Sequence, residues 1–432
     1  MQMAKNASPF KSFAILLIVL LPLCAADLVA KPGLSNARSL GMGGAYGALA
    51  LGAEAPYYNP ANLSIPSPWQ ISIAALGVGV GAANGSFTKG LYDKYNGQYL
   101  SGDSKREILG ALSDDGLYSR GSFEVQALSI SYRNMAFAAS VNGGFNGKIA
   151  KDLFDILLVE ANRIDKKYAF EPVSGQGQAL ASFAFSYGYQ IPAQLPFLYH
   201  LGVGVTAKYL KGLAFSEVTS AKAEAITRFT SVEALGDFHL RKSKGGDGFA
   251  VDIGATATLI NKWRVFLMLE NVLSRMSWHK ENEEAIIAFE TISSEVDEIL
   301  ASNSNVDSVF ASTDTTIAIS SFATGLPVVL NIGAVHSFGE FLVAAEYQQG
   351  FQEAALSTKS PIFSLGLNYR LLPYLRIRLG LSHEGHLGKA FSGGFGLLLR
   401  SVRWDVGVRS YGGLIAKHSK GLLLSTGLFM RF

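Results

Sequence analysis

Two stretches near the C-terminus decide the fold: Pro373-Tyr-Leu-Arg-Ile-Arg-Leu-Gly-Leu-Ser-His383 and Val402-Arg-Trp-Asp-Val-Gly-Val-Arg-Ser-Tyr411. In both stretches, apolar residues alternate with polar residues or glycine. Successive side chains of a β-strand point to opposite faces, so this period of two predicts strands with one apolar face. The second face carries arginines and an aspartate, so the two faces must meet different surroundings.

The composition of the whole chain favours a barrel that lies in a membrane. Of the 432 residues, 49% are hydrophobic and only 16% are charged, against roughly 25% charged in soluble domains. The mean hydropathy is +0.23, yet no stretch beyond the N-terminus is long and apolar enough for a membrane-spanning helix. A transmembrane β-barrel hides its hydrophobicity in alternating strands, and a secreted β-sandwich or β-helix is the rival.

The N-terminus has the pattern of a secretory signal. Lys5 and Lys11 precede an apolar run over 13–23, and small residues follow at 24–26. We expect cleavage after Ala26, with an uncleaved anchor helix as the alternative. Cleavage would also remove the single cysteine, Cys24, so a disulfide framework and a cysteine-rich metal site are excluded.

The alternation predicts fourteen strands along the chain, at about 69–82, 122–133, 134–143, 176–190, 198–212, 249–260, 262–271, 326–338, 340–350, 361–370, 373–383, 391–400, 402–411 and 421–432. The connections between these strands are short and longer in strict alternation. Outer-membrane barrels have an even strand number, short periplasmic turns and longer external loops, whereas a sandwich has no reason to sort its loops in this way.

The longer connections carry a few patterns of their own. A capping box at 104–107 and helical spacing over 152–164 predict surface helices. The region 217–242 could hold an extra hairpin, and we interpret it as a loop. The connection 272–325 has nine acidic residues against two basic ones, which indicates a solvated external loop, with ion bridging or partner docking as the alternative.

Aromatic residues on the apolar face form the second sign of a membrane barrel. All of them fall near a proposed periplasmic turn or the C-terminus, where the headgroup zone favours amphipathic rings. Ordinary core aromatics are the alternative. The predicted girdle consists of Trp263, Phe338, Phe341, Tyr369, Trp404 and Phe432.

Charged residues fall on the opposite face of the same strands. A lipid-facing arginine near the membrane midplane costs ~2–4 kcal/mol, so the charges should point into the lumen. Each could fill the barrel as part of an ion pair or contact a solute or plug. The predicted lumen-lining residues are Asp252, Arg264, Glu270, Glu346, Arg376, Arg378, Arg403, Asp405 and Arg409.

Signatures of an enzyme are weak. The chain has no G-x-S-x-G and no H-E-x-x-H, and the pair His383 and His386 lies in a short loop where its spacing alone is poor evidence for metal. Gly77-x-Gly79-x-Gly81 lies inside a strand and opens no helix, so it is not a dinucleotide fingerprint. No basic run supports nucleic-acid binding. We therefore expect no catalytic residue, no cofactor and no metal.

A glycine-rich segment precedes the first strand: Ala37-Arg-Ser-Leu-Gly-Met-Gly-Gly-Ala-Tyr-Gly47, then Glu54-Ala-Pro-Tyr-Tyr-Asn-Pro-Ala-Asn-Leu63. Its glycines allow close backbone packing and its Asn-Pro pair predicts a turn. The key residues of this motif are Gly41, Gly43, Gly44, Asn59, Pro60 and Ala61. A flexible periplasmic leader is the alternative to a packed segment.

This pair of motifs resembles the N-termini of the FadL-like outer-membrane superfamily, and within it the PorV/PorQ-type proteins. The barrel region is similar in Gly248–Asp252 and Leu267–Val272, and the terminal Phe432 looks like an outer-membrane assembly signal; Asn62 departs from the glycine that many members have. The resemblance implies a fourteen-stranded barrel whose N-terminal segment forms a hatch in the lumen, and recognition of Phe432 by the barrel assembly machinery.

We therefore predict an all-β protein in the outer membrane of a Gram-negative-type bacterium, with a signal peptide at 1–26, a plug at 27–66 and a transmembrane barrel at 67–432. Its surroundings would be outer-membrane lipid. By resemblance, it would pass hydrophobic or amphipathic small molecules, or act as a PorV-like component of type IX secretion that binds a secreted protein. An enzyme is disfavoured, and a wide polar lumen would instead indicate a general porin.

Overall fold

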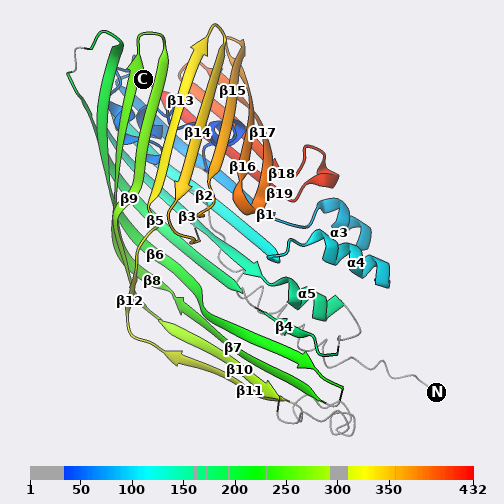
Figure 1. Ribbon diagram of the computed structural model, residues 1–432. Coiled ribbons are helices and arrows are strands. Elements are labelled where there is room, and N and C mark those ends of the chain that lie inside the picture. The colour runs from blue at the N-terminus through cyan, green and yellow to red at the C-terminus, as the bar shows by residue number, and fades with distance from the viewer. Residues whose placement is uncertain are drawn as a thin grey trace.

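The computed structural model describes residues 34–158, 164–170, 173–192, 195–229, 231–291, 310–355 and 357–432. The predicted signal peptide and residues 27–33 of the predicted plug therefore lie outside the described residues. These residues form one antiparallel sheet that closes into a barrel of 14 strands. Short turns join the strands at one end, at the top of Figure 1, and longer connections project from the other end.

Each barrel strand pairs with its neighbours along the chain, and β1 closes the circle by pairing with β19. The closure and the strand number confirm the architecture that alternation and loop lengths predicted. The barrel strands are β1 (Ile71–Asn84), β2 (Leu117–Tyr132), β3 (Met135–Ile149), β5 (Ser174–Gln190), β6 (Leu198–Thr227), β8 (Gly245–Leu259), β9 (Trp263–Lys280), β13 (Val329–Phe338), β14 (Phe341–Gly350), β15 (Ile362–Leu372), β16 (Leu375–Glu384), β17 (Gly388–Leu399), β18 (Val402–Tyr411) and β19 (Gly421–Arg431).

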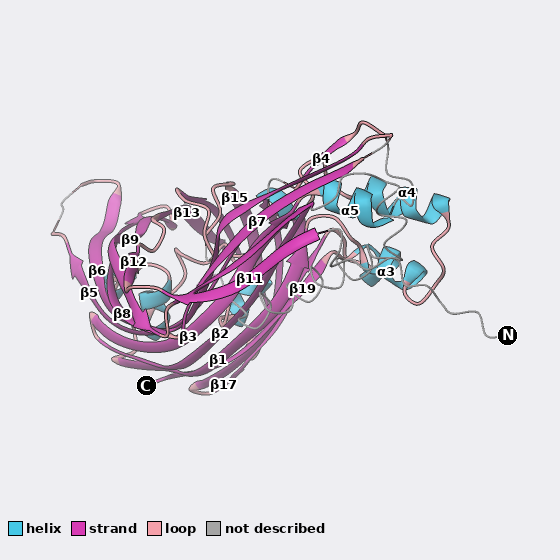
Figure 2. Ribbon diagram, turned by 90° about the horizontal axis from the view of Figure 1, so that it is seen from below, coloured by secondary structure: helices cyan, strands magenta, loops and turns pink. Residues whose placement is uncertain are grey.

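The interpretation of 217–242 as a loop is wrong. Strand β6 runs on to Thr227 and pairs with β7 (Val232–Ser243). Strand β7 pairs in turn with β10 (Glu283–Thr291), and β10 pairs with β11 (Phe310–Ala318). These strands form a sheet that continues the barrel wall past its long-loop end (Figure 2). The connection 272–325 is therefore partly β-structure, and its residues 292–309 lie outside the described residues.

Short elements complete the long-loop end. Strand β4 (Lys167–Ala169) pairs with β6, and β12 (Phe322–Thr324) pairs with β9. Three helices lie beside the barrel mouth: α3 (Lys89–Tyr95), α4 (Gly102–Ala111) and α5 (Lys151–Leu158). Helix α4 begins three residues earlier than predicted, because Ser101 rather than Ser104 provides the N-cap oxygen. Two 3₁₀ turns, η4 (Gly385–Leu387) and η5 (Ala416–His418), occupy the remaining loops.

No helix among the described residues is long and apolar enough to cross a membrane.

The two faces of the barrel wall are sorted as the alternation predicts. In β16, Leu379 is 57% exposed on the outside, whereas its neighbour Arg378 is 1% exposed. The same contrast recurs in β18 between Trp404 and Asp405. An apolar exterior beside buried charges fits a wall between lipid and a filled lumen.

The lumen contains the N-terminal residues 34–66. They fold into α2 (Ala37–Gly41) and the 3₁₀ helices η1 (Gly52–Tyr57) and η2 (Pro60–Ser64). These elements contact opposite parts of the wall, since α2 packs on β16–β19 while η2 packs on β5, β6 and β8. In Figure 1 they lie inside the barrel in its short-turn half.

The facing of β16 gives a direct test of membrane insertion. Leu379→Arg places a charge on the outer face at the middle of the strand and should destabilise the folded barrel by ~2–4 kcal/mol. Leu371→Arg is the matched control near the short turn, where the cost should be ~0–1 kcal/mol. Denaturant unfolding in lipid vesicles measures both, and equal costs would contradict the predicted membrane depth.

Candidate functional site

Three glycines shape the first turn of the N-terminal segment. Gly43 and Gly44 have φ angles of 68° and 94°, which side chains other than glycine rarely adopt. The backbone of Gly43 also lies against β16, where a Cβ on Gly380 would come within 2.1 Å of the Gly43 nitrogen. Gly41 lies against Arg378 and Gly394, each 3.4 Å from the position of a Cβ. The glycines predicted as a plug motif therefore permit close contact with the wall.

The Asn59-Pro60-Ala61 motif anchors the other half of the segment. The Asn59 side chain accepts a hydrogen bond from the Ala61 amide at 3.0 Å and donates one to the Ala255 carbonyl of β8 at 3.0 Å. Pro60 takes the first position of η2, where its missing N–H costs no hydrogen bond. A Cβ on the facing Gly204 would lie 2.3 Å from the Ala61 nitrogen. The segment can therefore pack this closely because the wall has a glycine at this position.

Asn62, the residue that departs from the family pattern, ties the segment together. Its amide nitrogen donates to the carbonyl oxygens of Gly47 and Ala50, both at 2.8 Å. Asn62 is also fully buried. It thus holds η2 against the preceding turn, a bridge that glycine could not make.

Glu54 is the central charged residue of the lumen, and the sequence did not single it out. Its carboxylate accepts four hydrogen bonds: from Asn36 at 3.0 Å, Arg38 at 3.1 Å, the Tyr46 hydroxyl at 2.9 Å and Arg403 of β18 at 2.9 Å. The first three partners belong to the segment and the fourth to the wall. Glu54 therefore both folds the segment and joins it to the barrel.

The network continues into the wall through Asp405. This carboxylate accepts from Arg403 at 2.6 Å and from Arg378 at 2.7 Å, and all three side chains are buried. The Arg403 guanidinium also lies 4.3 Å from the centre of the Phe429 ring. Three of the predicted lumen residues thus form one ion-paired cluster, which the separate alternating strands could not reveal.

The arginines determine the titration of Glu54. Burial alone would raise the pKa of the Glu54 carboxyl, but the guanidinium groups of Arg403 and Arg38 outweigh burial and hold the pKa below its ordinary value of 4.5. A carboxyl whose pKa is lower in the folded state stabilises that state above its ordinary pKa, and this stabilisation is lost as pH falls through the folded pKa.

Two further predicted lumen residues hold the segment by its backbone. Glu346 of β14 accepts from the amides of Tyr46 and Gly47 at 3.0 and 2.9 Å. Arg264 of β9 donates to the carbonyl oxygen of Ala48 at 3.0 Å. Backbone N–H and C=O groups buried in a lumen need hydrogen-bond partners. Side chains of the wall therefore provide the partners that these backbone groups of the segment lack within the segment itself.

The remaining predicted lumen residues pair within the wall or line a cavity. Asp252 lies 2.6 Å from Lys208, and Glu270 accepts from Asn331 at 2.8 Å. Arg409 donates to Glu384 at 2.6 Å. Arg376 is half-buried and lines a cavity at the short-turn end.

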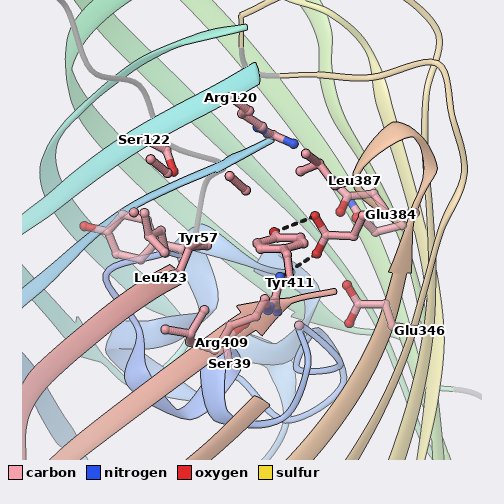
Figure 3. A pocket seen from close by; sticks show the side chains of 18 of the residues that line it. Ser39, Tyr57, Arg120, Ser122, Glu346, Glu384, Leu387, Arg409, Tyr411 and Leu423 are labelled. Atoms are coloured by element: carbon pink, nitrogen blue, oxygen red, sulfur yellow. Dashed lines mark hydrogen bonds and ion pairs between the residues drawn. The ribbon is translucent and has the colours of Figure 1, made fainter. Parts of the chain in front are cut away.

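A small cavity of about 50 Å³ separates the segment from the wall on the long-loop side. Figure 3 shows the Glu384 carboxylate accepting hydrogen bonds from Arg409 and from the Tyr411 hydroxyl, with Tyr57 of the segment and Arg120 of β2 bordering the same space. An apolar protein cavity that binds benzene measures about 150 Å³, so this space is too small for an aromatic ring.

The Leu267–Val272 motif marks an irregular point in the wall. Asn271 has a φ of 54°, and its amide donates to Asp252 at 2.8 Å. The pairing of β9 with β13 ends at Glu270, and pairing with β12 begins only at Met276. The Asn271 side chain donates to the Pro327 carbonyl at 3.0 Å inside this interval. The motif therefore encodes a bulge.

The six residues of the predicted aromatic girdle lie on the outer face next to the short turns. Phe341 and Tyr369 stack with ring centroids 4.6 Å apart, and Trp263 stacks on His336 at 4.8 Å. Trp404 packs edge-on against Phe395 at 5.8 Å. Phe338 and Phe432 are at least half-exposed. Within the described ranges, no group of three or more His, Cys, Asp or Glu residues could hold a metal ion.

The class of protein defined by this geometry is a closed fourteen-stranded barrel with an N-terminal segment packed across its lumen. A model of a family described as a family of unknown function, DUF5723, matches residues 60–404, so the chain belongs to this family. No curated protein matches the chain.

Solved structures show the same fold. The toluene transporter TbuX of Ralstonia pickettii is 14% identical with a TM-score of 0.50, and the alignment covers 92% of this chain and 99% of that chain. For the P. putida toluene transporter TodX, the identity is 13% and the TM-score 0.50, with 92% and 99% covered. At this identity the likeness concerns the fold alone, and it confirms the FadL-like fold that the N-terminal motifs implied.

Glu54→Gln should loosen the segment without unfolding the barrel. The amide cannot pair with Arg38 and Arg403, and removing one partner of a buried ion pair costs about 3–5 kcal/mol. Hydrogen exchange of the amides in 34–66 should accelerate accordingly, while the barrel strands keep their protection. Glu340→Gln is the matched control, because Glu340 pairs with Arg370 on the exposed short-turn rim. Equal exchange in both variants would contradict the anchoring role of Glu54.

The difference between wild type and Glu54→Gln should also depend on pH. Since the Glu54 pKa is lowered, the extra protection of wild type should be complete at neutral pH and persist at pH 4.5. It should vanish as the pH falls further and Glu54 becomes protonated. Hydrogen exchange of both proteins across this range, corrected for intrinsic rates, provides the measurement. A difference that is already lost well above pH 4.5 would refute the lowered pKa.

Proposed function

We propose that this protein passes hydrophobic or amphipathic small molecules across the outer membrane, with the described part of the predicted plug, residues 34–66, acting as the hatch. The observation that carries the proposal is the placement of the segment, which contacts β5, β6 and β8 on one side and β16–β19 on the other. A wide water-filled lumen, as in a general porin, would not need this packing. The toluene transporters that share the fold also support the passage of a small molecule.

The lining of the cavities favours an amphipathic solute over a pure hydrocarbon. Arg120, Glu384 and Arg409 border the 50 Å³ space together with Leu34 and Leu423. Charged side chains next to apolar ones would contact a polar head and an apolar body at the same time, once movement of the segment enlarges the space. We assign the girdle to the headgroup region of the periplasmic leaflet, because its aromatic residues face outward next to the short turns. We assign the terminal Phe432 to recognition by the barrel assembly machinery from the sequence resemblance.

A protein-binding role of the PorV type is the second candidate, and one observation favours it. Strands β6, β7, β10 and β11 build a sheet outside the predicted membrane zone. Its one side packs on α5 and β4 through Phe238 and Phe289. On its opposite side, His239 is hydrogen-bonded to Asp237 and Glu284. A sheet of this size is not needed to conduct a small solute, and it could hold a secreted protein at the surface.

Replacing Asn59-Pro60-Ala61 with Gly-Ser-Gly tests the hatch. The change removes the Asn59 bond to β8 and the fixed turn at Pro60, so the barrel should assemble but leak. Single-channel conductance and uptake of a hydrophobic dye should both rise. The same replacement at 413–415, in an exposed loop, is the control and should change neither quantity. If the conductance and dye uptake of the 59–61 variant equal those of wild type, the segment does not act as a hatch.

Replacing Glu283–Ala318 with a short Gly-Ser linker separates the two candidates. It removes β10 and β11 and leaves the barrel strands and the segment in place. Under the transport proposal, dye and solute uptake should stay at the wild-type level. Under the secretion proposal, a protein that co-purifies with wild type should be lost. Loss of uptake with unchanged co-purification would contradict the assignment of the pore to the barrel alone.

A further inference from the structure

A second cavity, of about 230 Å³, lies on the short-turn side of the N-terminal segment. It is the larger of the two spaces that border the segment. Trp69, just before β1, and Arg133, in the turn between β2 and β3, both border it. The cavity therefore faces the end of the barrel that the loop pattern assigns to the periplasm.

Its charge is strongly one-sided. Five arginines line it, Arg38, Arg133, Arg376, Arg403 and Arg431, against the single acid Glu54. The lining thus carries a formal charge of +4. Asp405, which pairs with Arg403, also pairs with Arg378. Adding Asp405 and Arg378 to the sum leaves the formal charge unchanged, because their charges cancel.

Three of these arginines have no described carboxylate within ion-pair distance. Arg38 and Arg403 pair with Glu54. Among the residues that the structure describes, none forms an ion pair with Arg133, Arg376 or Arg431. Arg431 lies over the Trp69 ring at 4.3 Å, and Arg133 over the Tyr132 ring at 5.4 Å. These aromatic contacts orient the guanidinium groups but do not cancel their charge.

Like charges in a confined space repel one another, and the fold keeps them together across five different elements. Arg38 comes from α2, Arg376 from β16, Arg403 from β18 and Arg431 from β19, while Arg133 lies in a turn. Guanidinium groups match oxyanions in planar, bidentate geometry. Such an arrangement is stabilised when an anion lies between the groups.

The cavity also has an apolar side. Leu49, Leu51 and Leu63 of the segment line it together with Leu342 and Phe429 of the wall. A ligand with an anionic head and an apolar body would satisfy both sides at once.

We propose that this cavity is an oxyanion-binding site, for a phosphate or carboxylate group, at the periplasmic face of the N-terminal segment. An anion there contacts Arg38 of the segment and Arg376, Arg403 and Arg431 of the wall. It therefore adds a bridge between segment and barrel and stabilises the arrangement in which the segment is packed in the lumen. The site does not depend on the proposed transport function, because binding is measured without uptake.

Calorimetric titration of the folded chain in a non-ionic detergent tests the site with three probes: decyl phosphate, inorganic phosphate and decanol. Decyl phosphate should bind at least about tenfold more tightly than decanol, because its phosphate accepts charge-assisted hydrogen bonds from the guanidinium groups whereas the hydroxyl of decanol carries no charge. Inorganic phosphate binding as tightly as decyl phosphate would support a site for the free anion. Weaker but measurable inorganic phosphate binding would support a site for an anionic amphiphile.

The variant R376Q/R431Q removes two of the unpaired charges and should weaken decyl phosphate binding at least about tenfold. R370Q/R400Q removes two charges from the same end of the barrel, outside the cavity lining, and should leave binding unchanged. Equal weakening in both variants would reduce the effect to general surface charge and overturn the proposal. Equal binding of decyl phosphate and decanol by wild type would overturn it without any variant.

Discussion

The bond between Glu54 and Arg403 is the interaction on which the rest of the lumen depends. An isolated carboxylate could not be buried in the middle of a barrel, because its desolvation would cost several kcal/mol. Four donors resolve this cost, three from the segment and one from the wall. The same contacts that keep Glu54 charged therefore place α2 and η1 next to β18. Glu346 and Arg264 then bind the turn between these helices.

The strand pattern was predictable because a membrane imposes it. Lipid on one side and a packed lumen on the other force alternation on strands such as β16 and β18, and the predicted fourteen strands are all present. Outside the membrane no such rule applies. The packed face of the distal part of β6 carries small residues such as Ala223 and Ala225, which give only a weak apolar signal, and a register shift between Val218 and Ser220 breaks the period of two. The extra hairpin was therefore missed.

The sequence predicted which charged side chains point into the lumen, but not which of them pair with one another. Period two placed Arg378, Arg403 and Asp405 inside, yet their partners come from strands and helices distant in sequence. Glu54 was within a quoted motif, and its one available signal was a lone acid in an otherwise apolar segment. The bridging role of Asn62 could not be predicted either. Its side chain donates to the backbone carbonyl oxygens of Gly47 and Ala50, and every residue type has such an oxygen.

The most direct test of the account is the conductance of single wild-type barrels in a planar bilayer. The segment contacts the wall on opposite sides, and the cavity on its long-loop side measures only about 50 Å³. Inserted wild-type protein should therefore carry no steady current, with brief openings at most. A stable ohmic current through the intact wild-type chain would contradict the claim that the N-terminal segment closes the lumen.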